Sequence, residues 1–144
     1  MRIPTPEEYQ LIIKSVKGYN PDAQILHPLT YRIYKENDKL IGFIAILKIS
    51  WYATEIRHLY VFPQYRNKGY GKKIVKSAVK QIPTPLIFAT ITTPESESVI
   101  KSVGFKLAHE FINPRTGNEV KVFVFKKQVG CKNNPIVFSP TITN

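Results

Sequence analysis

The sequence constrains the fold most strongly between residues 54 and 91, where an apolar strand, an amphipathic helix and a second apolar strand follow one another. Thr54–Phe62 is rich in β-branched and aromatic residues and stops at Pro63. In Gly71–Ile82, apolar side chains recur at helical spacing on one face, and two prolines follow. Leu86–Ile91 is a short apolar run typical of a buried strand. Because a helix that joins two strands of one sheet makes a right-handed parallel crossover, this segment predicts an α/β fold.

Antiparallel strands and further helices are predicted on both sides of this crossover. Thr5, Pro6 and Glu8 predict a helix that begins with a capping box and ends at Gly18 or Asn20-Pro21. The other expected elements are the strands Leu29–Lys35, Lys39–Ile49, Phe105–Ile112 and Glu119–Lys127, and a helix Glu95–Val103 closed by Gly104. We therefore expect a mixed, mostly antiparallel sheet with a parallel crossover and helices on both faces. Residues 1–127 are expected to form this single domain, and 128–144 a C-terminal tail that is flexible or packed as an arm.

The composition limits the class of protein. Twenty-one Lys and Arg residues against ten Asp and Glu residues give a net charge of +11, which favours anionic partners. Cys131 has no partner for an internal disulfide, no signal peptide opens the chain, and the apolar runs fall short of the ~20 residues that a membrane helix needs. We expect a cytoplasmic monomer or homodimer away from membranes. The three histidines and the cysteine show no metal-ligand spacing, so no metal site is expected.

The loop before the central helix carries the clearest functional signal. In Arg66–Gly71, two glycines let the chain turn with positive φ and let a ligand approach the backbone. The amides from Asn67 to Gly71 open a helix, and residues 66–80 hold six cations and no acid. These features predict a pyrophosphate-binding loop. The alternative is a glycine-rich turn beside a solvated basic helix face.

The loop and the strand before it resemble the signature of the GNAT superfamily of N-acetyltransferases, which is Arg/Gln-x-x-Gly-x-Gly/Ala after a strand that ends in valine, often followed by proline. The matching residues are Val61, Pro63, Tyr65, Arg66, Gly69 and Gly71. Val103-Gly104-Phe105 is similar to the family's second conserved region, and the resemblance extends over Tyr31–Lys127. It implies a GNAT-like α/β fold and acetyl-CoA as the acyl donor.

The resemblance also implies where acetyl-CoA binds, which is across the splayed strands Thr54–Phe62 and Leu86–Ile91. The backbone of Leu59, Tyr60 and Val61 is expected to pair with the pantetheine arm as an added strand does. The pyrophosphate is expected on the loop amides. The loop residues in question are Arg66, Asn67, Lys68, Gly69, Tyr70 and Gly71, with Lys72, Lys73 or Arg66 expected to reach the adenosine phosphates.

Acyl transfer to an amine needs a neutral nucleophile, and Glu55 is the expected general base because similar GNAT enzymes often have a glutamate at this place. Strand alternation predicts that Glu55, Arg57, Leu59 and Val61 share one face, with His58 and Tyr60 on the other. Two alternatives stay open. Glu55 is a strand-edge glutamate paired with Arg57 or a nearby lysine, or His58 serves as the base. The amide of Val61 is expected to meet the oxyanion.

The sequence departs from the family pattern in three places. The first helix is followed by only a short segment, so the acceptor-binding part is expected to be shortened. The other two departures are single residues. Ile100 stands where many members carry a tyrosine that protonates the leaving thiolate, and Thr93 stands where an asparagine is common. Tyr60, Tyr65 or Ser102 are the candidate substitutes for the acid. Cys131 lies in the tail without a recognisable partner histidine and is not expected to be a nucleophile.

We expect an N-acetyltransferase that acts on a primary amine. Some cations remain unassigned near the final hairpin, where the acceptor often lies in this fold: Arg115, Lys121, Lys126, Lys127 and Lys132. They favour an acceptor linked to an acidic protein or a nucleic acid over a polyamine, which this surface would repel. The alternatives are a non-catalytic CoA-binding module of the same fold and a basic nucleic-acid-binding module.

Overall fold

The computed structural model describes residues 1–91 and 93–127, and the strands of this part form one six-stranded sheet in the order β1-β2-β3-β4-β6-β5. β3 and β4 run parallel, and the other neighbouring pairs are antiparallel. The elements are α1 (Pro6–Tyr19), η1 (Pro28–Thr30), β1 (Tyr31–Glu36), β2 (Lys39–Lys48), β3 (Ala53–Val61), η2 (Pro63–Tyr65), α2 (Tyr70–Gln81), β4 (Leu86–Ile91), α3 (Pro94–Val103), β5 (Lys106–Ile112) and β6 (Glu119–Lys126). The predicted α/β class and parallel crossover are confirmed. The expected tail lies outside the described residues.

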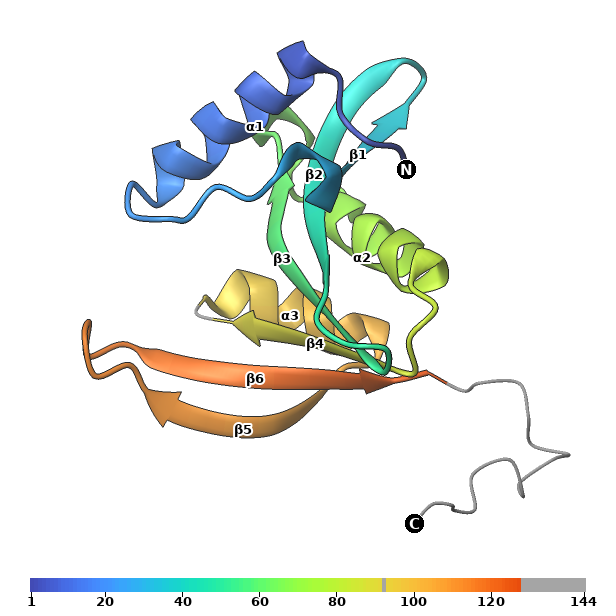
Figure 1. Cartoon of the computed structure of the whole chain (residues 1–144). Helices are drawn as coiled ribbons and strands as arrows, with labels where there is room; N and C mark the ends of the chain where they lie inside the picture. Colours follow the sequence, from blue (N-terminus) through green and yellow to red (C-terminus); the bar gives the residue numbers. More distant parts are fainter. Residues whose placement is uncertain (92, 128–144) are drawn as a thin grey trace, which may run out of the picture.

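Helices cover both faces of the sheet, as Figure 1 shows. On one face, α1 buries Ile12 and Val16 against Tyr31, Ile33 and Phe43 of β1 and β2. On the other face, α2 and α3 pack on β2, β3, β4 and β6. This larger core includes Ile44, Ile56, Ile74, Val75, Ala78, Ile82, Ile87, Ala89, Ile100, Phe105 and Phe123. No helix in the described residues is long and apolar enough to cross a membrane.

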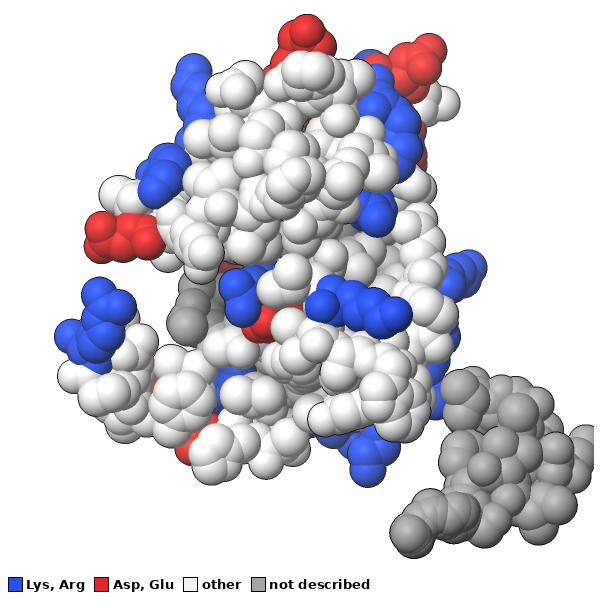
Figure 2. Space-filling model, in the orientation of Figure 1, with Lys and Arg blue, Asp and Glu red and all other residues white. Residues whose placement is uncertain are grey.

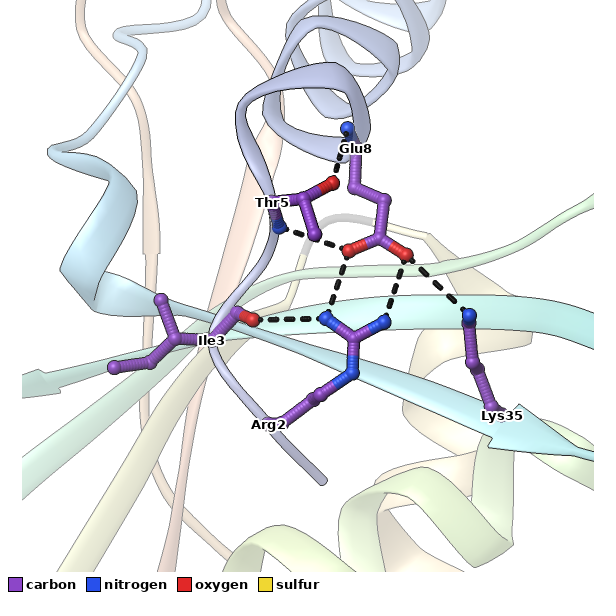
Figure 3. Close-up of polar contacts among 5 residues, drawn as sticks. All are labelled: Arg2, Ile3, Thr5, Glu8 and Lys35. Atoms are coloured by element: carbon purple, nitrogen blue, oxygen red, sulfur yellow. Dashed lines mark hydrogen bonds and ion pairs between the residues drawn. The ribbon is translucent and has the colours of Figure 1, made fainter. Parts of the chain in front are cut away.

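A polar cluster fixes the start of α1 to the edge of the sheet (Figure 3). The Thr5 side chain accepts a hydrogen bond from the Glu8 N–H, and the Glu8 carboxylate accepts one from the Thr5 N–H, so the predicted capping box is present. The Arg2 guanidinium donates to both Glu8 oxygens, at 2.9 and 3.0 Å, and Lys35 of β1 lies 3.6 Å away. Backbone hydrogen bonds between Arg2 and Ile33 add to this attachment.

The two parallel strands separate halfway along their length. β3 pairs with β4 from Ala53 to Ile56, and beyond this point the strands diverge, as the directions of β3 and β4 in Figure 1 show. A bulge in β3 follows at once, because Arg57 pairs with Ala45 whereas Tyr60 pairs with Phe43. The bulge includes His58, whose φ of 53° is rare for a residue with a side chain.

The bulge overturns the expected alternation of side chains along β3. Glu55 and Arg57 lie on the α1 side of the sheet together with Tyr60, whereas Leu59 and Val61 pack in the core beneath α2. The prediction that Glu55, Arg57, Leu59 and Val61 share one face is therefore wrong. One extra residue in a strand reverses the face of every residue after it.

Gly42 allows β2 to lie close to β3 just after the bulge. A Cβ at this position would lie 2.2 Å from the carbonyl oxygen of Tyr60 and 3.0 Å from the Ile74 side chain of α2. Such a contact with a main-chain oxygen cannot be relieved by turning a side chain, so the close approach of β2 to β3 depends on a glycine here.

The end of β6 closes the C-terminus of α2. The Lys127 ammonium donates hydrogen bonds to the carbonyl oxygens of Val79, at 2.8 Å, and of Ile82. These are among the carbonyl groups that a helix leaves unpaired at its end, and a cation is favoured there.

We expect Glu8→Gln to lower the free energy of unfolding by about 2 kcal/mol at pH 7, because the amide cannot form the ion pairs with Arg2 and Lys35. The hydrogen bonds from Arg2 are the main cause of the lowered pKa of Glu8, about 2 against an ordinary 4.5. The carboxylate therefore stabilises the fold fully above about pH 4.5, and this contribution disappears as the pH falls towards 2. Urea unfolding at several pH values measures both effects.

The control is Glu7→Gln, which makes the same chemical change at an exposed position in the same helical turn. It should change the stability by less than about 0.5 kcal/mol. Equal losses for the two variants at pH 7, or a Glu8→Gln loss that persists at pH 2, would contradict the role of the cluster.

Candidate active site

A pocket of about 470 Å³ lies where β3 and β4 diverge. Its walls come from β3, β4, the start of α3 and the end of α1. The lining residues include Glu55, Arg57, His58 and Leu59 of β3, Ala89, Thr90 and Ile91 of β4, Thr93, Ser96 and Ile100 at α3, and Tyr19 and Asn20 at the end of α1. The pocket therefore joins the expected catalytic strand to the expected donor cleft.

Glu55 and Arg57 form the charged centre of the pocket. Oε1 of Glu55 lies 2.8 Å from Nη2 of Arg57, and the Glu55 side chain is 8% exposed whereas that of Arg57 is 38% exposed. No other Lys, Arg, Asp or Glu is among the described lining residues. The ion pair that was the alternative for Glu55 is thus present, and it lies inside the pocket.

His58 is held by a buried hydrogen bond to Tyr31. The Tyr31 hydroxyl accepts a hydrogen bond from the Leu26 N–H at 3.3 Å and lies 2.9 Å from Nδ1 of His58. Because Tyr31 is fully buried and its own proton needs an acceptor, the hydroxyl donates to Nδ1, and the imidazole proton sits on Nε2. Burial lowers the pKa of His58 below its ordinary value, and the charge of Arg57 adds to this effect. His58 is therefore a neutral hydrogen-bond donor, which argues against the base role considered for it.

The peptide groups at the end of β3 show which backbone atoms face the open edge. The Phe62 N–H donates to a carbonyl of β2 at 2.9 Å, so the peptide groups of Val61 and Leu59 face the opposite side. The Val61 carbonyl accepts a hydrogen bond from Nε of Arg66 at 2.7 Å on that side. Of the three residues expected to pair with a pantetheine arm, Tyr60 turns its peptide towards β2.

The predicted phosphate loop lies at the N-terminus of α2. Gly69 precedes the helix with a φ of 83°, and a Cβ there would meet nothing within 4 Å. Gly71 has a different role from the one expected, because it lies within the helix. A Cβ at this position would lie 3.3 Å from the Val99 side chain of α3, so the glycine leaves room for Val99. Asn67 also has a positive φ, of 63°, and Lys68 and Lys72 are exposed.

The tyrosines near the loop pack against other aromatic rings outside the pocket. Tyr60 stacks between Phe43, at 5.1 Å between ring centroids, and Tyr19, at 5.8 Å, while the Arg66 guanidinium lies 5.1 Å from the Tyr60 ring. Tyr65 contacts Tyr70 edge to face. Neither Tyr60 nor Tyr65 lines the pocket around Glu55.

The two single-residue departures from the family pattern, Ile100 and Thr93, both line the pocket. Ile100 is 2% exposed and belongs to the core under α3, so its place offers no hydroxyl. Thr93 caps α3, because its side chain accepts a hydrogen bond from the Ser96 N–H at 3.3 Å. Ser102 donates to the Val99 carbonyl within α3 and does not line the pocket.

The contribution of α1 to this site was not predicted. Tyr19 and Asn20, at the end of α1, line the pocket, and the Tyr19 ring stacks on Tyr60 of β3 at 5.8 Å between ring centroids. The sequence predicted that the helix ends near Asn20, but it did not predict the direction in which the helix crosses the sheet.

Two cations that were unassigned in the sequence have partners within the fold. Lys121 lies 3.1 Å from Glu97 of α3, and Lys127 closes α2. Lys132 lies outside the described residues. Figure 2 shows Lys and Arg side chains spread around the visible face, with no continuous basic patch. No group of three or more His, Cys, Asp or Glu side chains suited to a metal ion occurs in the described residues.

Comparisons with known proteins agree on one family. The family model described as acetyltransferase (GNAT) family matches residues 4–102. An uncharacterized N-acetyltransferase encoded in the lysA 3' region of Bacillus methanolicus is 30% identical over 77 residues, which cover 52% of this chain. The match spans 59% of that relative's length.

Solved structures share the fold at low sequence identity. A GNAT acetyltransferase from Bacillus cereus has a TM-score of 0.69 and 17% identity, over 88% of this chain and 95% of that one. N-acetylglutamate synthase from Neisseria gonorrhoeae, in complex with coenzyme A and N-acetyl-glutamate, has a TM-score of 0.69 and 18% identity, over 90% of this chain and 35% of that one.

Protonation of His58 should destabilise the fold, because the folded state lowers the pKa of this histidine. The unfolded chain then binds more protons, so stability should be complete above about pH 6.5 and should fall as the pH drops below that value. In His58→Asn, whose side chain tolerates a positive φ, this pH-dependent loss should disappear. Urea unfolding between pH 7.5 and pH 5.5 measures it, with the exposed His109→Asn as control. A pH dependence that is unchanged in His58→Asn would contradict the assignment.

Proposed function

Because the chain belongs to the acetyltransferase (GNAT) family, we propose that it transfers an acetyl group from acetyl-CoA to a primary amine. The observation that carries the proposal is the separation of β3 from β4 beside the glycine loop. It leaves the Leu59 and Val61 peptides at an open strand edge next to a helix N-terminus. An added extended chain can pair with such an edge, and a pyrophosphate suits such a helix start. Acetyl-CoA has both parts, so the residues fit it.

In this proposal, Glu55 is the general base. An amine with a pKa of about 10.4 costs roughly 4–5 kcal/mol to deprotonate at pH 7, and a positioned base contributes about 10²–10⁴ in rate. Glu55 takes one proton from the acceptor ammonium, and the nitrogen then forms the C–N bond as the C–S bond breaks. The electron pair of the broken bond leaves on sulfur, and the second amine proton passes to the thiolate or to water. The Val61 N–H donates to the carbonyl oxygen as negative charge develops there.

The absence of a hydroxyl at Ile100 does not prevent this reaction. A thiol with a pKa of about 8.5 leaves as a thiolate at a cost of only about 2 kcal/mol at neutral pH. Tyr60 and Tyr65 remain the candidate acids of the proposal, although their aromatic contacts keep them out of the pocket lining. Direct loss of the thiolate needs neither of them.

The acceptor in this proposal is an anionic molecule rather than a polyamine, and the reaction takes place in the cytoplasm. The net charge of +11 supports the preference. Fewer cations support this preference than the sequence indicates, because Lys121 is paired with Glu97 and Lys127 caps α2. An acceptor linked to a protein or to a nucleic acid stays within the proposal.

The second candidate function is a CoA-binding module without catalysis, which the apolar Ile100 favours. Both functions require the same loop. They differ in whether Glu55 affects turnover. A nucleic-acid-binding module is less well supported, because it does not account for the glycine loop, and the basic side chains on the face drawn in Figure 2 do not form one surface.

Coenzyme A binding should depend on Gly69. Acetyl-CoA and free CoA at a hundredfold excess over the dissociation constant should each stabilise the protein by about 2.7 kcal/mol, and ATP should do so much less. Gly69→Ala should weaken this effect, because a Cβ at a φ of 83° strains the loop. Thermal unfolding at increasing ligand concentration measures both.

Gly117→Ala is the matched control, because Gly117 has a φ of 76°, equally open surroundings and a place in the distant β5–β6 turn. Both variants should lose about 1–2 kcal/mol of stability, and only Gly69→Ala should lose CoA binding. Equal shifts with CoA and ATP would indicate a nonspecific basic surface instead.

Glu55→Gln should lower the rate of thiol release in the presence of an acceptor amine by about 10²–10⁴, with little change in CoA affinity. The exposed Glu110→Gln, on β5, is the control and should keep the wild-type rate. An unchanged rate in Glu55→Gln would remove its role as base, and no amine-dependent release in the wild type would favour the CoA-binding module.

A further inference from the structure

The pocket keeps its charges as one closed pair. Oε1 of Glu55 and Nη2 of Arg57 are 2.8 Å apart, and the carboxylate is nearly buried. Leaving a buried carboxylate without a cation is costly. An amine that approaches Glu55 must therefore compete with Arg57, and the displaced guanidinium is then available to an anionic group at the pocket opening.

We propose that the acceptor is a small amine that carries its own carboxylate, as a free amino acid does, and that Arg57 binds this carboxylate while Glu55 receives the amine. The inference rests on the proposed function and deepens it, because it assigns the acceptor to one chemical class. Arg57 becomes a substrate-binding residue in place of a structural partner of Glu55.

Charge balance is the first argument for this class. Before binding, the pocket holds one ion pair and no net charge from its lining residues. An amino acid brings one positive and one negative group, so both protein charges gain a partner and the net charge stays zero. A simple amine brings a positive charge next to Arg57, and a polyamine brings several. The acceptor ammonium and the Arg57 guanidinium would repel each other in one pocket, and this repulsion is stronger away from bulk water.

The geometry of β3 is the second argument. Glu55 and Arg57 are two residues apart on the same side of the strand, and such residues are separated by about 6.6 Å along it. The amine and the carboxylate of one small molecule can span that separation. Arg57 is 38% exposed, so its guanidinium can turn from Glu55 towards the pocket opening without leaving a buried gap. Its planar fork matches the two oxygens of a carboxylate.

His58 supplies a neutral donor beside these charges. Nδ1 is occupied by the Tyr31 hydroxyl, so the ring carries its proton on Nε2, and the residue lines the same pocket. A neutral donor can bind a carboxylate oxygen without adding a charge that would need a partner once the product has left.

The first test uses the wild-type chain. Thiol release from acetyl-CoA is measured with each standard amino acid, with the α-carboxamide of each and with phosphoethanolamine. At least one amino acid should have a kcat/KM at least tenfold above that of its own carboxamide, because the carboxamide keeps the amino group but loses the carboxylate that Arg57 would bind.

Three results would overturn the proposal. Equal turnover of acids and carboxamides would mean that Arg57 does not select the acceptor, and the proposed acetyltransferase function would stand. A preference for phosphoethanolamine would mean that the anion is a phosphate. No turnover of any amine, together with no stabilisation by CoA, would remove the proposed function as well.

The second test measures binding without the donor. The preferred amino acid is titrated calorimetrically into the wild type, Arg57→Gln and Arg57→Lys. Arg57→Gln should weaken binding at least tenfold and abolish the preference for the acid, and Arg57→Lys should lose less because it keeps the charge but not the fork. Arg32→Gln removes an arginine of β1 that does not line the pocket, and it should keep the wild-type preference. Wild-type affinity in Arg57→Gln would overturn the role of Arg57.

Discussion

The separation of β3 from β4 is the constraint on which the rest of the site depends. Hydrogen bonding between the parallel strands ends at Ile56, and the bulge at His58 then turns β3 towards α1. The hydrogen bond between Tyr31 and His58 holds the bulge from the α1 side, and Gly42 lets β2 follow the displaced strand. Backbone strain at His58 is tolerated because these neighbours fix its position.

The same bulge explains why the Glu55–Arg57 ion pair can lie next to the open edge of β3. Before it, Glu55 and Arg57 lie on the α1 side; after it, the peptides of Leu59 and Val61 face the gap. A regular strand would continue to hydrogen bond with β4 and would leave no open edge. In the proposed reaction, the general base and the strand edge for the extended ligand therefore both depend on one local irregularity within a few residues of the chain.

The sequence predicted the elements and the parallel crossover, but it missed the bulge and several contacts between elements. Apolar periodicity, the capping box at Thr5 and the glycine at 104 predicted element bounds that agree with the structure to within a few residues. These signals are local. The bulge depends on the register between β2 and β3, the room at Gly71 depends on Val99 of α3, and the partner of Lys127 is a helix end far away in the chain. None of these has a local sequence signal, so strand alternation placed Leu59 on the wrong face.

The cap that Lys127 forms on α2 also sets an order of events during synthesis. α2 begins at the glycine loop, yet the ammonium that closes its far end is 48 residues beyond Val79 in the chain. β6 must in addition insert between β4 and β5 before Lys127 reaches the helix. Non-local contacts of this kind form late, because loop closure opposes them. On the ribosome, the C-terminal end of α2, opposite the glycine loop, is therefore completed only when β6 and Lys127 have emerged.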